Sequence, residues 1–201
     1  MFGAVLPREF YLEPTPFVAR SLRGKIVVVT GAPEPVAGRI VEAEAYLGAR
    51  DPASHAYRGK TARNASMFGD AGHAYVYFSY GVHWMLNFVT QPAGVGEAVL
   101  IRAIEPVAGI EAMRVAAGAG TGLPDYRLAN GPGKLARALG ITRARHDGVD
   151  LCDPRGGICV CDDGSTISDS AVTTSRRIGI SSAVESPLRF YVTASPAVSR
   201  K

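Results

Sequence analysis

Two glutamates stand two residues apart in an otherwise apolar stretch, IVEAEAYLG, which runs from Ile40 to Gly48. If this stretch is a strand, its side chains alternate between two faces, so Glu42 and Glu44 share one face with Tyr46. Two steps of strand rise would place the carboxylates roughly 7 Å apart. The remaining residues divide in the same way: Ile40 lies beside the glutamates, and the opposite, apolar face holds Val41, Ala43, Ala45 and Leu47. The neighbouring like charge is expected to raise the pKa of at least one of the two carboxyl groups.

Paired carboxylates are typical of glycoside hydrolases, and about 7 Å falls in the range of inverting enzymes. A glycosidase pair must flank its bond from opposite sides, whereas residues i and i+2 of one strand point the same way. We therefore expect one carboxylate to do the chemistry and the other to take a structural partner such as an arginine.

Three further polar residues do not fit the pattern of the segments around them. They are Arg102 in the apolar run VLIRAI, Asn87 in the apolar run WMLNFV and His55 in the loop DPASHAYRG. Singly, each is better explained by structure, with Arg102 as an ion-pair partner of a glutamate, Asn87 as a sheet-edge amide and His55 as a solvated loop residue. A buried guanidinium needs an anionic partner in any case. Taken together with the aromatic run AYVYFSY, they predict a pocket that holds a flat heterocycle between rings, next to a reacting group.

The elements that position these residues follow from periodicity, turn residues and caps. A helix is expected over 15–24, with Thr15 as its N-cap, and two more over 107–118 and 131–140. A polar loop covers 49–72, and residues 143–170 are expected to be irregular. Strands are predicted over 25–30, 36–46, 74–80, 83–90, 98–106, 174–181 and 188–193. These elements predict one domain over 1–201, with a mixed α+β fold in which a curved, largely antiparallel sheet is flanked by helices and carries a protruding β-hairpin.

Composition narrows the class of protein. The 201 residues carry a formal charge of +4, and 18 of the 22 basic residues are Arg by count. Arg grips phosphate bidentately, which favours a nucleic-acid partner, but the composition bias of a GC-rich genome explains the same count equally well. The chain has no apolar run long enough to span a membrane and no signal peptide at its start, so we expect a cytoplasmic, nucleoid-associated protein. The three clustered cysteines are expected to be reduced thiols rather than metal ligands or a disulfide framework.

Several longer blocks make the sequence resemble the alkyladenine (3-methyladenine) DNA glycosylase family. They are GRIVEAEAYLG, RNASMF, YVYFSYG, LIRAIEP, NGPGKL and PLRFYV with SPAVS, and they occur in the family's order over nearly the whole chain. The resemblance implies a monofunctional base-excision-repair enzyme. Such an enzyme flips a damaged purine, such as 3-methyladenine or hypoxanthine, out of duplex DNA and hydrolyses its N-glycosidic bond, leaving an abasic site.

The resemblance also assigns roles to individual residues. Glu44 matches the general base that activates water, and Arg102 and the main-chain carbonyl of Ile178 match groups that hold this water. The residues that match the stacking and hydrogen-bonding contacts to the flipped base are Tyr46, His55 and Tyr77. Asn87 matches a residue that crowds the purine 2-position and so disfavours guanine.

Contacts to the rest of the DNA are implied in the same way. Tyr80, at or next to the hairpin tip, matches the wedge that fills the space left by the nucleotide. Lys60, Thr61, Arg63 and Lys134 are expected to contact phosphates. The expected partner is double-stranded DNA containing damaged purines, and the protein is expected to be a monomer. No metal or organic cofactor is implied because water is the nucleophile.

Two alternatives stay open. One is a catalytically silent module that binds damaged DNA, and the other is a hydrolase of small nucleosides, in which Tyr80 and the basic loop would have no task. The chain departs from the family pattern at residues 143–170 and in the turn 90–97, which is somewhat longer than the pattern. Neither departure involves Glu44.

Overall fold

The computed structural model describes residues 2–31, 34–79 and 81–200. Within them, one curved sheet runs in the order β1-β7-β2-β3-β6-β5-β4, with β9 also pairing with β3 and β8 pairing with β9. Every strand pairing in this part of the chain is antiparallel. The strands are β1 (Ala4–Val5), β2 (Ile26–Val29), β3 (Val36–Tyr46), β4 (Ala74–Ser79), β5 (His83–Thr90), β6 (Glu97–Ala108), β7 (Ile158–Asp162), β8 (Val172–Ser175) and β9 (Arg189–Val192).

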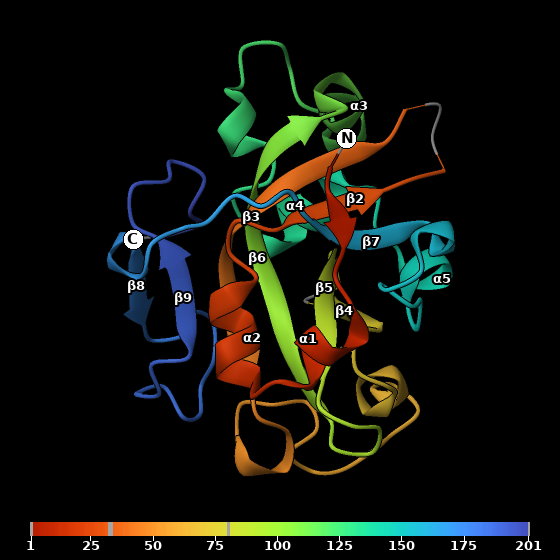
Figure 1. Cartoon of the computed structure of the whole chain (residues 1–201), viewed down its shortest axis with the longest axis vertical. Coiled ribbons are helices and arrows are strands. Elements are labelled where there is room, and N and C mark those ends of the chain that lie inside the picture. Colours follow the sequence, from red (N-terminus) through yellow and green to blue (C-terminus); the bar gives the residue numbers. More distant parts are fainter. Residues whose placement is uncertain (1, 32–33, 80, 201) are drawn as a thin grey trace.

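Short helices flank this sheet, and α1 and α2 lie in front of it in Figure 1, with the β8–β9 hairpin at one side. The helices are α1 (Arg8–Leu12), α2 (Thr15–Ser21), α3 (Ile110–Ala117), α4 (Pro132–Ala138) and α5 (Arg143–His146). The segment between β3 and β4 forms the loops at the bottom of the view, in orange and gold. The predicted fold class, a mixed α+β fold with a curved antiparallel sheet, is confirmed.

The main core lies between the helices and one face of the central strands. It contains Val18, Ala19 and Leu22 from the α2 region, with Ala43, Ala45, Val99 and Ile101 from β3 and β6. Burial of these apolar side chains, at about 25 cal/mol per Å², fixes which face of β3 and β6 is turned inward. The opposite face of the same strands is free to carry polar chemistry.

A β-bulge in β3 corrects the alternation expected from the sequence. The register of β3 against β6 shifts between Ile40 and Glu42 and again between Glu42 and Ala43. Ile40 therefore lies in the main core with Ala43, whereas Val41 packs on the other side in a small separate cluster. A bulge inserts one extra residue and reverses the facing of the residues after it. The two-residue alternation does hold from Glu42 to Tyr46.

Two other segments differ from prediction. Residues 143–170 were expected to be irregular, but they contain α5 and β7, and β7 pairs with both β1 and β2. Its residues Ile158, Cys159, Val160 and Cys161 are all buried, because a core cluster covers each face. The strand expected over 174–181 ends at Ser175. The rest of that segment crosses the polar face of β3, which matters for the site.

The predicted cap of α2 is also wrong. Thr15 is the first helical residue rather than the N-cap, and its side chain makes no cap hydrogen bond. Its hydroxyl instead bonds with the Thr90 hydroxyl at 2.7 Å and donates to Glu97 at 2.5 Å. These buried contacts tie α2 to the ends of β5 and β6.

Candidate active site

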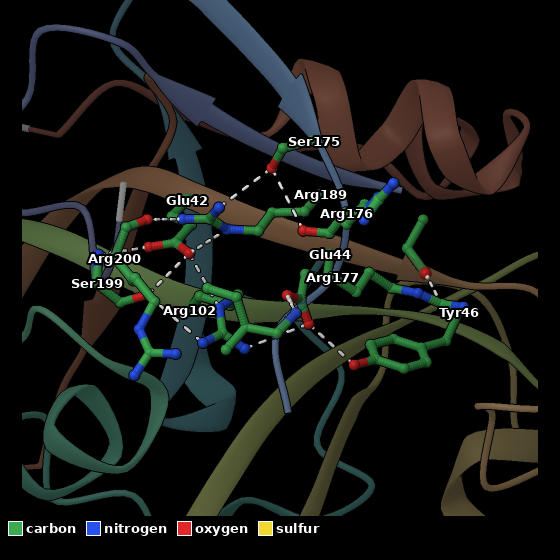
Figure 2. A network of polar contacts seen from close by, with 12 residues as sticks. Glu42, Glu44, Tyr46, Arg102, Ser175, Arg176, Arg177, Arg189, Ser199 and Arg200 are labelled. Atoms are coloured by element: carbon green, nitrogen blue, oxygen red, sulfur yellow. Dashed lines mark hydrogen bonds and ion pairs between the residues drawn. The ribbon is translucent and has the colours of Figure 1, made fainter. Parts of the chain in front are cut away.

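The polar face of β3 carries a buried network of carboxylates and arginines, drawn in Figure 2. Glu42 is completely buried, and its Oε1 accepts hydrogen bonds from Arg189 Nε at 2.7 Å and Arg102 Nε at 3.0 Å. Ser199 adds its main-chain N–H to Oε2 at 2.6 Å and its hydroxyl to Oε1 at 2.8 Å. With four donors around it, Glu42 has little acceptor capacity left. This supports the structural role expected for one of the two glutamates.

Glu44 is equally buried but has a different set of partners. Tyr46 donates its hydroxyl to Oε2 at 2.9 Å, the main-chain N–H of Ile178 donates to Oε1 at 2.8 Å, and Arg102 Nη1 lies 3.3 Å from Oε2. Burial raises the pKa of Glu44 above its ordinary value, and it outweighs the opposing effects of Arg102, Ile178 and Tyr46. The like charge of Glu42 also raises this pKa, but less than burial does. A carboxylate tuned upward in this way is a better base near neutral pH.

Arg102 joins the two glutamates, because its Nε pairs with Glu42 and its Nη1 with Glu44. From the sequence we expected Arg102 to pair with a single glutamate, either Glu42 or Glu44. Ile178 was predicted to hold water through its main-chain carbonyl, and the contact seen in the structure is its N–H to Glu44. The role of the carbonyl stays a prediction.

A pocket lies next to Glu44, and Tyr46 connects the two. The Tyr46 ring lines the pocket, and its hydroxyl donates to the Glu44 carboxylate. All four residues predicted to contact the base line this pocket, together with Tyr75 of the predicted aromatic run and two residues that the sequence did not single out, Ala53 and Met67. The lining residues are Tyr46, Ala53, His55, Met67, Tyr75, Tyr77 and Asn87. The rings of His55 and Tyr77 meet edge to face with centroids 4.4 Å apart. This aromatic wall suits a flat heterocycle.

Two polar side chains of the pocket are held by fixed contacts. His55 is exposed, yet its Nδ1 lies 3.0 Å from the Tyr75 hydroxyl, so it is more than a solvated loop residue. Neighbouring protein atoms displace water from the imidazole ring, and this desolvation, together with the charge of Arg63, lowers the pKa of His55 and favours the neutral form at pH 7. Asn87 is buried and donates from Nδ2 to the carbonyls of Tyr75 at 3.1 Å and Met85 at 3.4 Å. Its amide is therefore oriented by the backbone.

An ion pair that the sequence analysis missed lies behind the pocket wall. The side chain of Arg177 is fully buried and donates to both carboxylate oxygens of Asp51. Nη1 donates to Oδ2, and Nη2 donates to Oδ1 at 2.8 Å. Its guanidinium carbon lies 4.7 Å from the centre of the Tyr46 ring, and its Nη1 donates to the carbonyl of Ala45 at 3.0 Å. Burial alone would raise the pKa of Asp51, but the hydrogen bonds it accepts from Arg177 and two main-chain amides lower it. The pair fixes the ring that reaches Glu44.

The residues predicted to grip phosphates fall into two groups. Thr61 bonds with Asn64 through its N–H and hydroxyl, and it shares a hollow with Arg63 and His55 next to the base pocket. Arg63 donates to the carbonyl of Phe78 at 3.1 Å, which ties the loop to β4. Lys60 is an exposed residue of the same loop.

Lys134 is separate in the chain and lies on α4, where it donates to Asn130 at 2.9 Å. Its neighbour Gly133 packs so closely on the start of β5 that an added Cβ would come within 2.6 Å of His83. Gly133, and with it the start of α4 that carries Lys134, therefore lies beside the turn end of the β4–β5 hairpin. Tyr80, the predicted wedge at the tip of that hairpin, lies outside the described residues.

Neither a metal cluster nor a membrane span is found in the part of the chain that the structure describes. No group of three or more His, Cys, Asp or Glu side chains there is arranged to hold a metal ion. No helix there is long and apolar enough to cross a membrane.

Comparisons with known proteins agree with this geometry. The family model described as methylpurine-DNA glycosylase (MPG) matches residues 9–196. Proteins named "Putative 3-methyladenine DNA glycosylase" from Burkholderia lata and Koribacter versatilis are 48% and 46% identical to this chain, over 197 and 199 residues. These alignments cover 98% of this chain in both cases, and 92% and 94% of the relatives. A protein of the same name from Methanoculleus marisnigri is 46% identical over 200 residues, covering 98% of this chain and 99% of the relative.

The family model and these near full-length relatives confirm the predicted resemblance. They also confirm the predicted enzyme class, since the family is one of hydrolases that cleave N-glycosyl bonds in DNA. The chain belongs to the methylpurine-DNA glycosylase family.

Proposed function

We propose that this chain is a monofunctional DNA glycosylase that flips alkylated or deaminated purines out of duplex DNA and hydrolyses their N-glycosidic bond with water activated by Glu44. The observation that carries the proposal is the buried Glu44 carboxylate, whose pKa is raised and which the pocket residue Tyr46 contacts directly. A general base placed at the edge of an aromatic pocket is what hydrolysis of a purine nucleotide requires.

The base would stack in the pocket between Tyr46 and the edge-to-face pair of His55 and Tyr77. Stacking on an aromatic side chain contributes about 1–3 kcal/mol per base. A purine alkylated on a ring nitrogen carries a positive charge, which the faces of tyrosine rings attract. Its glycosidic bond is also weakened, so an alkylated nucleotide is hydrolysed faster than a normal one once both are bound. Asn87, oriented by two main-chain carbonyls, would crowd the amino group at the purine 2-position and so disfavour guanine.

In the chemical step, the water oxygen bonds to the sugar C1′ while the N-glycosidic bond breaks and its electron pair leaves with the purine. Glu44 accepts the proton of the water, and its negative charge stabilises the positive charge that develops on the sugar. Arg102 and the carbonyl of Ile178 would hold the water. Among the described lysines, Lys25 pairs with Asp162 and Lys134 bonds with Asn130, and none contacts Glu44, so we expect no Schiff base and an abasic site in an uncut strand as the product.

The remaining contacts would place the duplex against this face. Tyr80 would enter the gap left by the flipped nucleotide, and the polar and basic residues of the loop and of α4 would contact phosphates. Lys60, Thr61, Arg63 and Lys134 are the residues concerned. The expected state is a monomer in which 1–201 acts as a single domain.

The test uses excess protein with a duplex containing one hypoxanthine and, separately, with methylated duplex DNA, both with chelator present. Free base release is measured for wild type and for Glu44→Gln, and Glu105→Gln serves as a matched control because Glu105 lies on β6 away from the pocket. We expect release by wild type and by the control, none by Glu44→Gln, and duplex binding by all three. Strand cleavage should appear only after alkali treatment.

The other outcomes separate the alternatives. Duplex binding without base release from either substrate would contradict catalysis and favour a silent binding module. Neither binding nor release would favour a hydrolase of small nucleosides. Release that persists in Glu44→Gln would show that another group is the base.

A further inference from the structure

A second cleft lies away from the base pocket, between the α1–α2 region and the segment 165–169. It measures about 610 Å³, within the range of small-molecule sites. Part of its lining is apolar and comes from Phe10, Phe17 and Ile167. Ser21 and Thr166 add hydroxyl groups to the same lining. The cleft therefore offers an apolar wall with hydrogen-bonding groups beside it.

The feature that sets this cleft apart is Arg23. This residue lines the cleft and is only 8% exposed, yet its Nε and Nη1 are buried without any hydrogen-bond partner. Its guanidinium carbon lies 5.9 Å from the centre of the Phe190 ring, and Arg23 forms no ion pair with any other described residue. Burial and the like charge of Arg20 lower the pKa of Arg23 to about 10 against the weaker opposing effect of Asp169, so Arg23 is still charged at pH 7. A buried cation that cannot lose its proton needs an anion.

No carboxylate pairs directly with Arg23 among the described residues: Asp169 attracts it from a distance, but that carboxylate is bonded to Arg20. The other two cations of the lining, Arg20 and Lys25, are already paired, with Asp169 at 2.7 Å and Asp162 at 2.6 Å. Their charges are balanced within the cleft. The charge of Arg23 is the one left over among the described lining residues.

The cleft faces away from the proposed DNA site. Phe190 lies under Arg23, whereas the preceding residue of β9, Arg189, pairs with Glu42 in the buried network. Successive residues of a strand point to opposite faces. The cleft and the carboxylates therefore lie on opposite faces of β9, so a duplex seated on the Glu44 face would not fill the cleft.

We propose that this cleft binds a small organic anion, a carboxylate or phosphate monoester attached to an apolar group, with the anionic head on Arg23 and the apolar group against Phe10, Phe17 and Ile167. The hydroxyls of Ser21 and Thr166 complete the contacts to the head group. Nε and Nη1 of Arg23 are themselves covered by protein atoms, so the head group approaches the guanidinium at Nη2 and balances its charge.

The test titrates full-length, isotope-labelled protein with benzoate, with phenyl phosphate and with benzyl alcohol, and it follows the main-chain amide resonances by NMR. Benzoate and phenyl phosphate are expected to give saturable shifts confined to residues around the cleft, and the tighter of the two identifies the head group. Arg23→Met keeps an apolar stem without the charge, and it should weaken binding of that anion at least about tenfold. The double variant Arg20→Met with Asp169→Asn removes a cation together with the carboxylate that it pairs with, and it should not weaken binding.

Thermal unfolding gives a second, independent measurement. The preferred anion should raise the melting temperature of wild type but not of Arg23→Met, because a ligand stabilises only a state that binds it. Release of hypoxanthine should be equal in wild type and Arg23→Met, so failure of this proposal is distinguishable from failure of the proposed function.

Four results would overturn the proposal. They are the absence of saturation with both anions, equal affinity in Arg23→Met, equal affinity for benzyl alcohol, and displacement of the anion by undamaged duplex DNA. The last would make the cleft a phosphate contact of the DNA instead.

Discussion

The two glutamates of β3 should fail in different ways when each loses its charge. Glu42 accepts hydrogen bonds from Arg102, Arg189 and Ser199, all buried or partly buried. Glu42→Gln keeps the shape but leaves two arginines with insufficient negative charge. Glu44→Gln keeps an acceptor for the N–H of Ile178, and Arg102 keeps Glu42. The first substitution should therefore damage the fold, and the second should damage only the proposed chemistry.

The magnitude follows from the burial of the network. Breaking a buried ion pair by removing one partner costs about 3–5 kcal/mol. For a chain of this size, about 2–4 °C of melting temperature is lost per kcal/mol, so Glu42→Gln should melt about 6–20 °C below wild type. Native proteins have only about 5–15 kcal/mol of stability, so the variant should fold but with a reduced margin. Glu44→Gln should stay within about 1 kcal/mol of wild type, because removing a costly buried charge offsets the loss of its pairing with Arg102.

Urea unfolding at pH 7, followed by the fluorescence of the single Trp84, measures both free energies of unfolding. Far-UV circular dichroism over the same urea range checks that both probes report one transition. Equal stability of the two variants would refute the division of roles. So would a Glu42→Gln variant within about 1 kcal/mol of wild type, since that would mean the network tolerates an uncompensated arginine.

Five further predictions concern the pocket and the residues that support it. Base release should fall as the pH drops through a midpoint above 4.5, the ordinary pKa of a glutamate, because burial raises the pKa of Glu44; single-turnover rates between pH 4 and 8 test this. By the same shift, the stability of wild type relative to Glu44→Gln should decline as the pH rises through that midpoint, because the folded state holds the proton more tightly, and urea unfolding at each pH measures it. Tyr46→Phe should move the rate midpoint upward, because the hydroxyl hydrogen bond that it removes lowers the pKa of Glu44. Asn87→Ala should increase release of normal guanine relative to hypoxanthine by roughly tenfold or more, measured as free base from undamaged and hypoxanthine-containing duplexes. Arg177→Met should destabilise the fold by about 3–5 kcal/mol by leaving Asp51 buried and unpaired, and adding Asp51→Asn should recover part of that loss in urea unfolding.

Local patterns predicted much of the architecture. The strand over 36–46 has the same bounds as β3, and the expected hairpin of two aromatic strands is formed by β4 and β5. Both segments are rich in signals that act between near neighbours, namely β-branched and aromatic residues bounded by turn residues. The pocket residues could be grouped because each stood out as a polar or aromatic exception within such a segment. Their assigned roles needed the family resemblance as well.

The features that could not be predicted depend on contacts between distant segments. Arg177 and Asp51 are 126 residues apart in sequence, and neither interrupts an apolar strand, so no local signal marks the pair. Residues Ile158 to Cys161 form a short apolar run that is equally compatible with a strand or a loop until β2 lies beside it. The bulge near Val41 has no residue signature at all in this chain. Its position is fixed by the fit of β3 between β6 and β9.

The charge arrangement explains why two carboxylates stand so close together. Arg102, Arg189, Glu42 and Glu44 balance to zero net charge, and Arg102 contacts both glutamates through different nitrogens. In the proposed reaction Glu44 takes up a proton and its attraction for Arg102 weakens. Because Glu42 still holds the Nε of Arg102, the guanidinium stays in place, and Glu44 can gain and release a proton without reorganising the site. If Glu44 were the only partner of Arg102, protonation of Glu44 would release the arginine from its position. Because Glu42 also holds Arg102, Glu44 can titrate while the arginine stays fixed.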